Sequence, residues 1–173
     1  MDSVYTNLEG RACKKTILEE ITGAAILDCP GVGGFTLHVF SDDDRSTVNI
    51  VSAEKKVFEL RYSDVVTEGF SWLGKKAEWR VTRHDGKIVP AALIVRVNGT
   101  DQTDLRHPKR VPLLAVAQIR QTEACVVTTL SAGSAAANAR ARAIADGPAL
   151  PCLKTVVPPA RSASTTKTAM RSA

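Results

Sequence analysis

Apolar and polar side chains alternate with a period of two along most of the chain as far as residue 131, which is the pattern of half-buried β-strands. The alternation is clearest in Lys76–Ile119, where a run around Trp79 is followed by Asp85-Gly86 and then by a second long apolar run. Asp-Gly is a strong signal for a tight hairpin because both turn positions tolerate positive φ. We therefore expect two or three long strands in this stretch to organise the fold.

The second of these runs, Ile88–Val97, carries apolar residues at both odd and even positions. A strand of this kind is typically buried on both faces. Pro90 cannot donate a hydrogen bond to a strand ladder, so its position indicates an edge or a bulge. The polar segment Asn98–Lys109, which contains Gly99 and Pro108, is then expected to be an exposed loop.

Shorter runs predict the elements on either side. Upstream we expect an edge strand over Val4–Thr6, a hairpin from Lys15 to Leu27 turning at Thr22-Gly23, a hairpin over residues 34–51 and an alternating run over residues 57–62. Downstream we expect strands over Val111–Ile119 and Ala124–Thr129, then a helix over Ser134–Ala145 that stops at Asp146-Gly147-Pro148. In Ser63–Gly74 the period is unclear, and a loop or a short helix, with Phe70 and Trp72 tucked under the sheet, fits the residues. The expected fold is mainly β (α+β), an antiparallel curled sheet or small barrel with one C-terminal helix.

Length and composition favour a single globular domain. The chain has 173 residues, of which 44% are hydrophobic and 24% are charged, and both values are typical of globular proteins. Residues 1–153 are expected to form this domain. Residues 154–173 contain mainly Pro, Ser, Thr, Ala and a few cations and are expected to form a disordered basic tail. No apolar run approaches the ~20 residues of a spanning helix, so no transmembrane segment is expected.

Most of the net charge of +5 lies in that tail. Four cations and no Asp or Glu follow residue 153, which leaves a net charge of +1 for residues 1–153. Nucleic-acid binding needs Lys and Arg clustered on a folded face. This distribution therefore predicts no specific nucleic-acid partner.

The four cysteines favour two disulfides over a zinc site, because zinc ligands usually come in close pairs and no C-x-x-C pair is present. Of the three possible pairings, Cys13–Cys29 with Cys125–Cys152 closes the shortest loops and is preferred. Each bridge would stabilise the fold by about 3 kcal/mol. Buried free thiols are the alternative, and a reducing cytosol would favour them.

Disulfides point to an oxidising compartment, yet the start Met1-Asp2-Ser3-Val4 has neither the basic residues nor the apolar run of a signal peptide. Two explanations compete: a signal has been removed or lost from this version of the sequence, or the protein is cytosolic with free thiols. The first is preferred, so the expected location is periplasmic or secreted and the alternative is cytoplasmic.

A family resemblance supports export. The resemblance rests on stretches between Tyr5 and Leu153. In order along the chain they are Y-T-N-L-E-G-R-A-C-K, L-D-C-P-G-V-G-G-F, F-S-W-L-G-K-K-A-E-W-R-V, V-P-A-A-L-I-V-R-V, A-C-V-V-T, A-R-A-I-A-D and P-C-L. In these motifs, above all C-P-G-V-G-G and L-G-K-K-A-E-W-R, the chain resembles an uncharacterised family of small bacterial proteins that begin with a signal peptide. The resemblance implies export to the periplasm or beyond. It implies no activity, cofactor or catalytic residue.

Candidate catalytic and ligand motifs are weak. Gly31-Val32-Gly33-Gly34 lacks the last glycine of a dinucleotide fingerprint and precedes a strand, so a structural corner is expected. Asp42–Asp44 lacks the spacing of a calcium loop and is expected to be a solvated turn. The alternative to a binding protein is a small periplasmic hydrolase near His84, with Ser71 or Ser41 as nucleophile and Asp85 as orienting acid. We expect no metal and no cofactor.

Four residues are the candidates for an interaction surface: Phe70, Trp72, Arg80 and Arg106. Aromatic and arginine side chains supply much of the energy at recognition surfaces. Core packing for the aromatics and a solvated face for the arginines are the competing interpretations. The preferred hypothesis is an exported, non-enzymatic binding or interaction module for an unknown protein or envelope ligand. A variant of it is an inhibitor that acts through the loop Asn98–Lys109.

Overall fold

The computed structural model describes residues 1–101 and 106–157. Within them ten strands form one sheet: β1 (Asp2–Asn7), β2 (Lys14–Ile17), β3 (Ala25–Pro30), β4 (Thr36–Asp42), β5 (Arg45–Val51), β6 (Val57–Glu59), β7 (Ser71–His84), β8 (Lys87–Asp101), β9 (Lys109–Ile119) and β10 (Ala124–Ser131). Three helical elements complete it: a 3-10 turn η1 (Gly10–Ala12), a single-turn α1 (Tyr62–Val65) and α2 (Ala137–Ala145).

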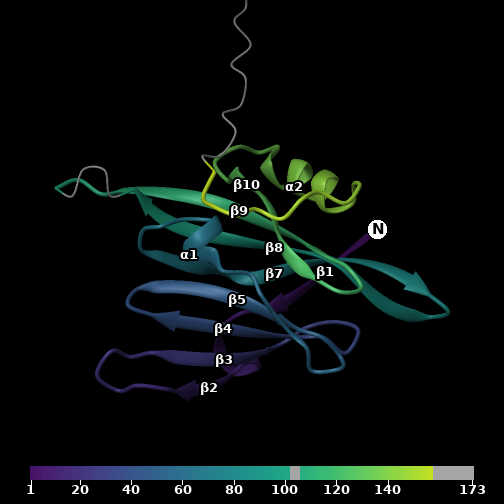
Figure 1. The fold of residues 1–173 in the computed structure, drawn as a ribbon, viewed down its shortest axis with the longest axis horizontal. Coiled ribbons are helices and arrows are strands. Elements are labelled where there is room, and N and C mark those ends of the chain that lie inside the picture. The colour runs from purple at the N-terminus through teal and green to yellow at the C-terminus, as the bar shows by residue number, and fades with distance from the viewer. Residues whose placement is uncertain (102–105, 158–173) are drawn as a thin grey trace, which may run out of the picture.

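The strand order is β10-β9-β8-β7-β5-β4-β3-β2, with β1 beside β7 and β6 beside β5. All pairs are antiparallel except one parallel contact, between Arg45 of β5 and Ser71 of β7. Figure 1 shows a curled sheet with β2 at the bottom and β9, β10 and α2 at the top. The two ends of the sheet do not pair, so the prediction of a mainly β fold with a C-terminal helix is confirmed as an open sheet and not as a small barrel.

The three longest strands, β7, β8 and β9, lie side by side in the sheet, as the alternation predicts. The turn between β7 and β8 places Asp85 and Gly86 at φ of 49° and 74°, the positive values that a two-residue hairpin requires. The β7–β8 register shifts where Arg80 faces Ala92 and Val81 faces Pro90. Pro90 therefore sits at a bulge, as its missing N–H group predicts.

Both faces of β8 are buried, in two separate cores. Leu93 and Val95 join the larger core around Trp79, whereas Ala92 and Ile94 join a smaller core beneath α2. The helix contributes Ala137, Ala141 and Ala145, spaced four apart on one face. Small side chains let the helix axis approach the sheet closely, so the Ala-rich composition of this segment serves packing as well as helix propensity.

Two expectations need correction. Phe70 and Trp72 are not tucked under the sheet, since they are 36% and 46% exposed. The buried side chains of Tyr62 and Val65 in α1 fill that space. Part of the predicted loop Asn98–Lys109 instead extends the strands, because β8 continues to Asp101 and β9 starts at Lys109. Residues 102–105, and residues 158–173 of the predicted tail, lie outside the described residues.

The cysteines pair in the preferred order. The sulfur atoms of Cys13 and Cys29 are 2.07 Å apart, and those of Cys125 and Cys152 are 1.98 Å apart. Cys13 lies opposite Cys29 in a continuation of the β2–β3 register, so the first disulfide joins two neighbouring strands. The second disulfide ties the segment after α2 to β10.

In the described part of the chain, no helix is long and apolar enough to cross a membrane.

Candidate functional site

A groove of about 500 Å³ opens where the ends of β7, β8 and β9 lie side by side. We call it the tryptophan groove, and it is lined by Trp72, Asn98, Gly99, Arg110 and Pro112. Its volume lies within the range of small-ligand sites, about 300 to 1,000 Å³. The groove contains one of the four residues predicted for the interaction surface.

The sheet register explains how this groove forms. Trp72 lies opposite Asn98, which lies opposite Pro112, so these three side chains form one row across the sheet. In the next row Thr100 donates its backbone N–H to the carbonyl of Phe70 and lies opposite Arg110. Residues two apart on a strand share a face. The two rows therefore bring an indole, an amide and a guanidinium to one surface.

The aromatic side chains here are held but not covered. The guanidinium of Arg45 lies 5.2 Å from the ring centroid of Phe70 and pairs with the Asp43 carboxylate at 2.7 Å. Trp72 has 46% of its surface exposed. Large exposed aromatics with a neighbouring cation are typical of recognition surfaces, so this arrangement offers a flat apolar contact beside a positive charge.

Arg80 lies in a different environment from the other predicted surface residues. Only 6% of it is exposed, and its guanidinium donates to the Asp146 carboxylate at 2.6 and 2.8 Å and to the Met1 carbonyl at 2.7 Å. A buried arginine is tolerated only when its charge is paired. Arg80 therefore fastens α2 and β1 to the sheet and is not part of an accessible surface.

Glu78, 8% exposed, continues this buried network. It accepts hydrogen bonds of 2.5 Å from Arg142 of α2 and from Ser3 of β1. Burial alone would raise the pKa of Glu78, but the hydrogen bonds from Arg142 and Ser3 and the attraction of the Arg142 charge outweigh it and lower that pKa. The hydrogen bonds from Arg80 likewise lower the pKa of Asp146.

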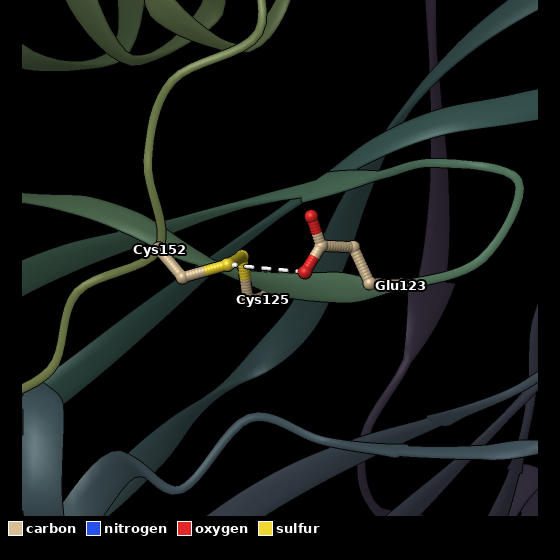
Figure 2. Close-up of side chains that lie close together, drawn as sticks. All are labelled: Glu123, Cys125 and Cys152. Carbon is tan, nitrogen blue, oxygen red and sulfur yellow. Dashed lines mark hydrogen bonds between the residues drawn. A yellow bond between two sulfur atoms is a disulfide. The ribbon is translucent and has the colours of Figure 1, made fainter.

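The second disulfide lies beside a carboxylate. Figure 2 shows Oε2 of Glu123 pointing at Sγ of Cys152, 3.6 Å away. The ligand-type atoms of Glu123, Cys125 and Cys152 all lie within 4.8 Å of one another. Metals bind the thiolate form of cysteine, and here both sulfurs are bonded to each other. With the disulfide formed, these three residues are not a metal site.

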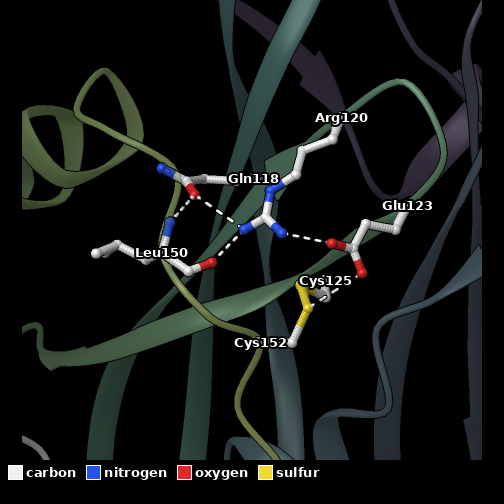
Figure 3. Close-up of a disulfide and its surroundings, with 6 residues drawn as sticks. All are labelled: Gln118, Arg120, Glu123, Cys125, Leu150 and Cys152. Carbon is white, nitrogen blue, oxygen red and sulfur yellow. Dashed lines mark hydrogen bonds and ion pairs between the residues drawn. A yellow bond between two sulfur atoms is a disulfide. The ribbon is translucent and has the colours of Figure 1, made fainter.

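Polar contacts reinforce this disulfide (Figure 3). Arg120 donates to Oε1 of Glu123 at 2.5 Å and also to the carbonyl of Leu150, and Leu150 donates its N–H to Gln118 at 2.9 Å. Further along, Leu153 donates its N–H to the Val126 carbonyl at 2.8 Å. We call these contacts together with the Cys125–Cys152 bridge the C-terminal clamp. It lays residues 148–153 across β9 and β10.

A second cleft, of about 540 Å³, is lined by apolar residues that include Phe35 and Phe58 and by polar residues that include Glu54 and Arg120. Lys56 at its rim donates to the Thr122 carbonyl at 2.7 Å and lies 4.8 Å from the Phe58 ring centroid. Its cation is therefore already engaged within the protein. The tryptophan groove, whose aromatic ring is the more exposed, is the better candidate for binding.

The residues of the hydrolase hypothesis are not brought together. Ser71 and His84 are the first and last residues of β7, about 40 Å apart at the usual rise of a strand. Ser71 is 2% exposed, and Ser41 shares a 3.2 Å hydrogen bond with Ser46. His84 is exposed beside the Asp85-Gly86 turn. The described geometry thus assembles none of the proposed triads.

Sequence reasoning missed most of the groove. Asn98 falls in the predicted loop Asn98–Lys109, and Arg110 lies between that loop and the predicted strand Val111–Ile119, so no strand register was available to place them beside Trp72. Arg106 is exposed, as expected for a surface residue. The one usable signal is the short spacing of Phe70 and Trp72, since residues two apart in an extended segment point to the same side.

The fold and site define a disulfide-linked, open β-sheet protein with one C-terminal helix and an aromatic groove at the end of its longest strands. Comparisons with protein-family models, with curated proteins and with solved structures found no match.

Proposed function

We propose that the protein is an exported, non-enzymatic binding module that holds a protein or envelope ligand in the tryptophan groove. The half-exposed indole of Trp72 beside Arg110 and Asn98 is the observation that carries the proposal. An indole offers a flat apolar surface and a guanidinium binds carboxylate or phosphate. The ligand therefore combines an apolar group with an anionic one.

One observation and one expectation from the sequence support an extracytoplasmic location. All four cysteines lie at disulfide distance in two pairs, and structural disulfides are typical of periplasmic and secreted proteins. The resemblance to signal-peptide-bearing bacterial proteins points to the same compartment. In that setting the two bridges would stabilise a sheet that works outside the reducing cytosol.

A quantitative capture experiment tests the function. Full-length wild type, Trp72→Ala and Arg110→Glu are immobilised at equal density and incubated with a bacterial envelope extract, and the retained species are quantified by mass spectrometry. Removing an aromatic hot spot costs about 2 kcal/mol or more, so wild-type-specific species should fall at least about tenfold in yield on Trp72→Ala. Arg110→Glu should lose the same species.

The matched control is Val57→Ala, which truncates a side chain 47% exposed on β6, outside the groove. It should retain the same species at wild-type yield. Equal yields on wild type, Trp72→Ala and Arg110→Glu would exclude the groove as the binding surface.

A further inference from the structure

A smaller pocket, of about 230 Å³, lies between α2 and the sheet. Three cations line it, Lys76 of β7, Arg96 of β8 and Arg142 of α2, and among the described residues of the lining Glu78 is the one acid. We call it the cationic pocket. Pockets that hold a whole small ligand are usually about 300 to 1,000 Å³. The cationic pocket therefore has room for one chemical group of a ligand.

The carboxylate of Glu78 neutralises Arg142 and not the other two cations. Its Oε1 accepts hydrogen bonds of 2.5 Å from Ser3 and from Arg142, and its Oε2 accepts one of 3.3 Å from Arg142. Within the part of the chain that the structure describes, no hydrogen bond or ion pair engages the ammonium of Lys76 or the guanidinium of Arg96. Two positive charges in the pocket are thus uncompensated.

An irregularity in β7 brings these two cations together. The β7–β8 register shifts between Leu73 and Ala77, so that the three residues Gly74–Lys76 lie opposite Arg96 alone. Bulges redirect side chains and are common next to active sites. A Cβ at Gly74 would lie 3.0 Å from the Cβ of Arg96. The absence of a side chain at Gly74 therefore lets Arg96 lie close against β7, beside Lys76.

This concentration of positive charge is local. Residues 1–153 carry a net charge of +1 in total, whereas the three cations and one carboxylate of the pocket sum to +2. The excess does not reflect a generally basic surface. A hollow lined by charges of one sign focuses the electric field and raises the local concentration of counter-ions. The lining of the pocket therefore favours an anion.

A phosphate monoester matches the pocket in charge and in hydrogen bonding. It carries a charge of about −1.5 to −2 at neutral pH and three acceptor oxygens, whereas a carboxylate would neutralise one charge. The guanidinium of Arg96 presents N–H donors in a planar fork that suits phosphate oxygens. Lys76 adds an ammonium, and the exposed Asn138, near the start of α2, adds an amide donor.

The cationic pocket adjoins the tryptophan groove. Arg96 and Leu114, which line the pocket, lie opposite each other on β8 and β9, and so do Asn98 and Pro112, which line the groove. The two pairs are two residues apart on each strand. Residues at this spacing share a face and are separated by about 7 Å. The two hollows therefore occupy neighbouring rows on one face, with Trp72 in the groove row.

We propose that the cationic pocket binds the phosphate of a small phosphate monoester whose apolar substituent lies against Trp72. Lys76 and Arg96 bind the phosphate oxygens, and Arg142, held by Glu78, borders the site. The inference deepens the proposed function, on which its apolar half rests. It names the class of ligand and adds a second cationic contact on the side of the groove away from Arg110.

Isothermal titration calorimetry of the full-length, oxidised chain in a low-salt, phosphate-free buffer tests the site, with inorganic phosphate and phenyl phosphate as probes. Both should bind wild type. The double variant K76Q/R96Q should weaken both at least about tenfold, because it removes the hydrogen bonds from both unpaired cations. Phenyl phosphate should bind about threefold or more tightly than inorganic phosphate, and Trp72→Ala should remove that advantage, because the phenyl ring contacts the indole.

The matched control is K87Q/R140Q, which removes two exposed cations of β8 and α2 that do not line the pocket. It should bind both probes as wild type does, and circular dichroism of each variant verifies folding. An equal loss of affinity in K87Q/R140Q and K76Q/R96Q would show unspecific attraction and overturn the site. Wild type that binds neither probe up to about 10 mM also overturns it.

The results separate this inference from the proposed function. If capture from the envelope extract depends on Trp72 and Arg110 but neither probe binds, the phosphate site is wrong and the groove function stands. If Trp72→Ala changes neither capture nor the affinity for phenyl phosphate, the apolar half is wrong and the proposed function falls with it.

Sedimentation with vesicles distinguishes the two sources of a phosphate monoester. Phosphatidic acid carries this group in its headgroup, so vesicles that contain it in phosphatidylcholine should retain wild type and release K76Q/R96Q if the ligand is a lipid. Retention of neither chain, together with binding of phenyl phosphate, assigns the site to a soluble ester. Equal retention of both chains would mean that the vesicles attract the protein outside the cationic pocket, which overturns the lipid assignment.

Discussion

The two ends of the sheet are built in opposite ways. At the β10 end, the C-terminal clamp lays residues 148–153 across the last strands, and α2 covers one face. At the β2 end, no described element covers the outer edge, and three aliphatic side chains are exposed. Each end carries a disulfide, but Cys125–Cys152 closes an edge whereas Cys13–Cys29 braces one that stays open. The two disulfides thus stabilise a covered end and an uncovered end of the same sheet.

The strongest test of the closed end is Arg80→Ala. Removing one partner from a buried ion pair leaves the other charge unpaired, which costs about 3 to 5 kcal/mol, and Arg80 is 6% exposed with Asp146 as its main partner. We expect the free energy of unfolding to fall by that amount in chemical denaturation. Arg83→Ala is the control, because Arg83 pairs with Asp2 at 3.7 Å on the exposed surface, where such a pair contributes at most about 1 kcal/mol.

Next in size is removal of the second disulfide. The double variant Cys125→Ser with Cys152→Ser opens a bridge between residues 27 apart in sequence, and a loop of that length is worth about 3 kcal/mol. We expect a loss of that size in unfolding free energy and faster proteolysis after residue 147. Unchanged proteolysis there would mean that Arg120 and Gln118 hold the segment without the bridge.

A smaller effect is expected from acid. Folding lowers the pKa values of the Glu78 and Asp146 carboxyl groups below their ordinary values. A carboxyl group of this kind makes its full contribution to the unfolding free energy above its pKa in the unfolded chain, about 4. That contribution is lost as the pH falls through the lower pKa of the folded state. The unfolding free energy should therefore decline below about pH 4. Glu78→Gln and Asp146→Asn should each flatten that decline, and Glu68→Gln, on the exposed surface, should retain it.

The smallest effect is expected at the open edge. Ile21 is 94% exposed, so Ile21→Ser should change the unfolding free energy of the monomer by no more than about 0.5 kcal/mol. The measurement is chemical denaturation of wild type and variant under the same conditions. A larger loss would show that Ile21 packs within its own chain.

The elements predicted best are those with local signals. The β2–β3 and β4–β5 hairpins and the Asp85-Gly86 turn follow from alternation and turn residues close together in sequence. Helix α2 begins three residues later than predicted and ends where Asp146-Gly147-Pro148 predicts. Local propensity decides these elements because their partners are neighbours in the chain.

The misplaced residues depend on partners far away in the sequence. Arg80 occupies a polar position of an alternating strand, which predicts solvent exposure, but α2 and β1 cover that face and supply Asp146, 66 residues away. Phe70 and Trp72 are outside the core because Tyr62 of α1 occupies the space below the sheet. No periodicity within one strand reveals what a distant element will cover.

Amide hydrogen exchange compares the two ends most directly. The amide of Leu153, which is bonded to Val126, should be strongly protected, and those of Lys15 and Ile17 should exchange at nearly the unprotected rate. An Ile17 amide that exchanges as slowly as the Leu153 amide would contradict the open edge.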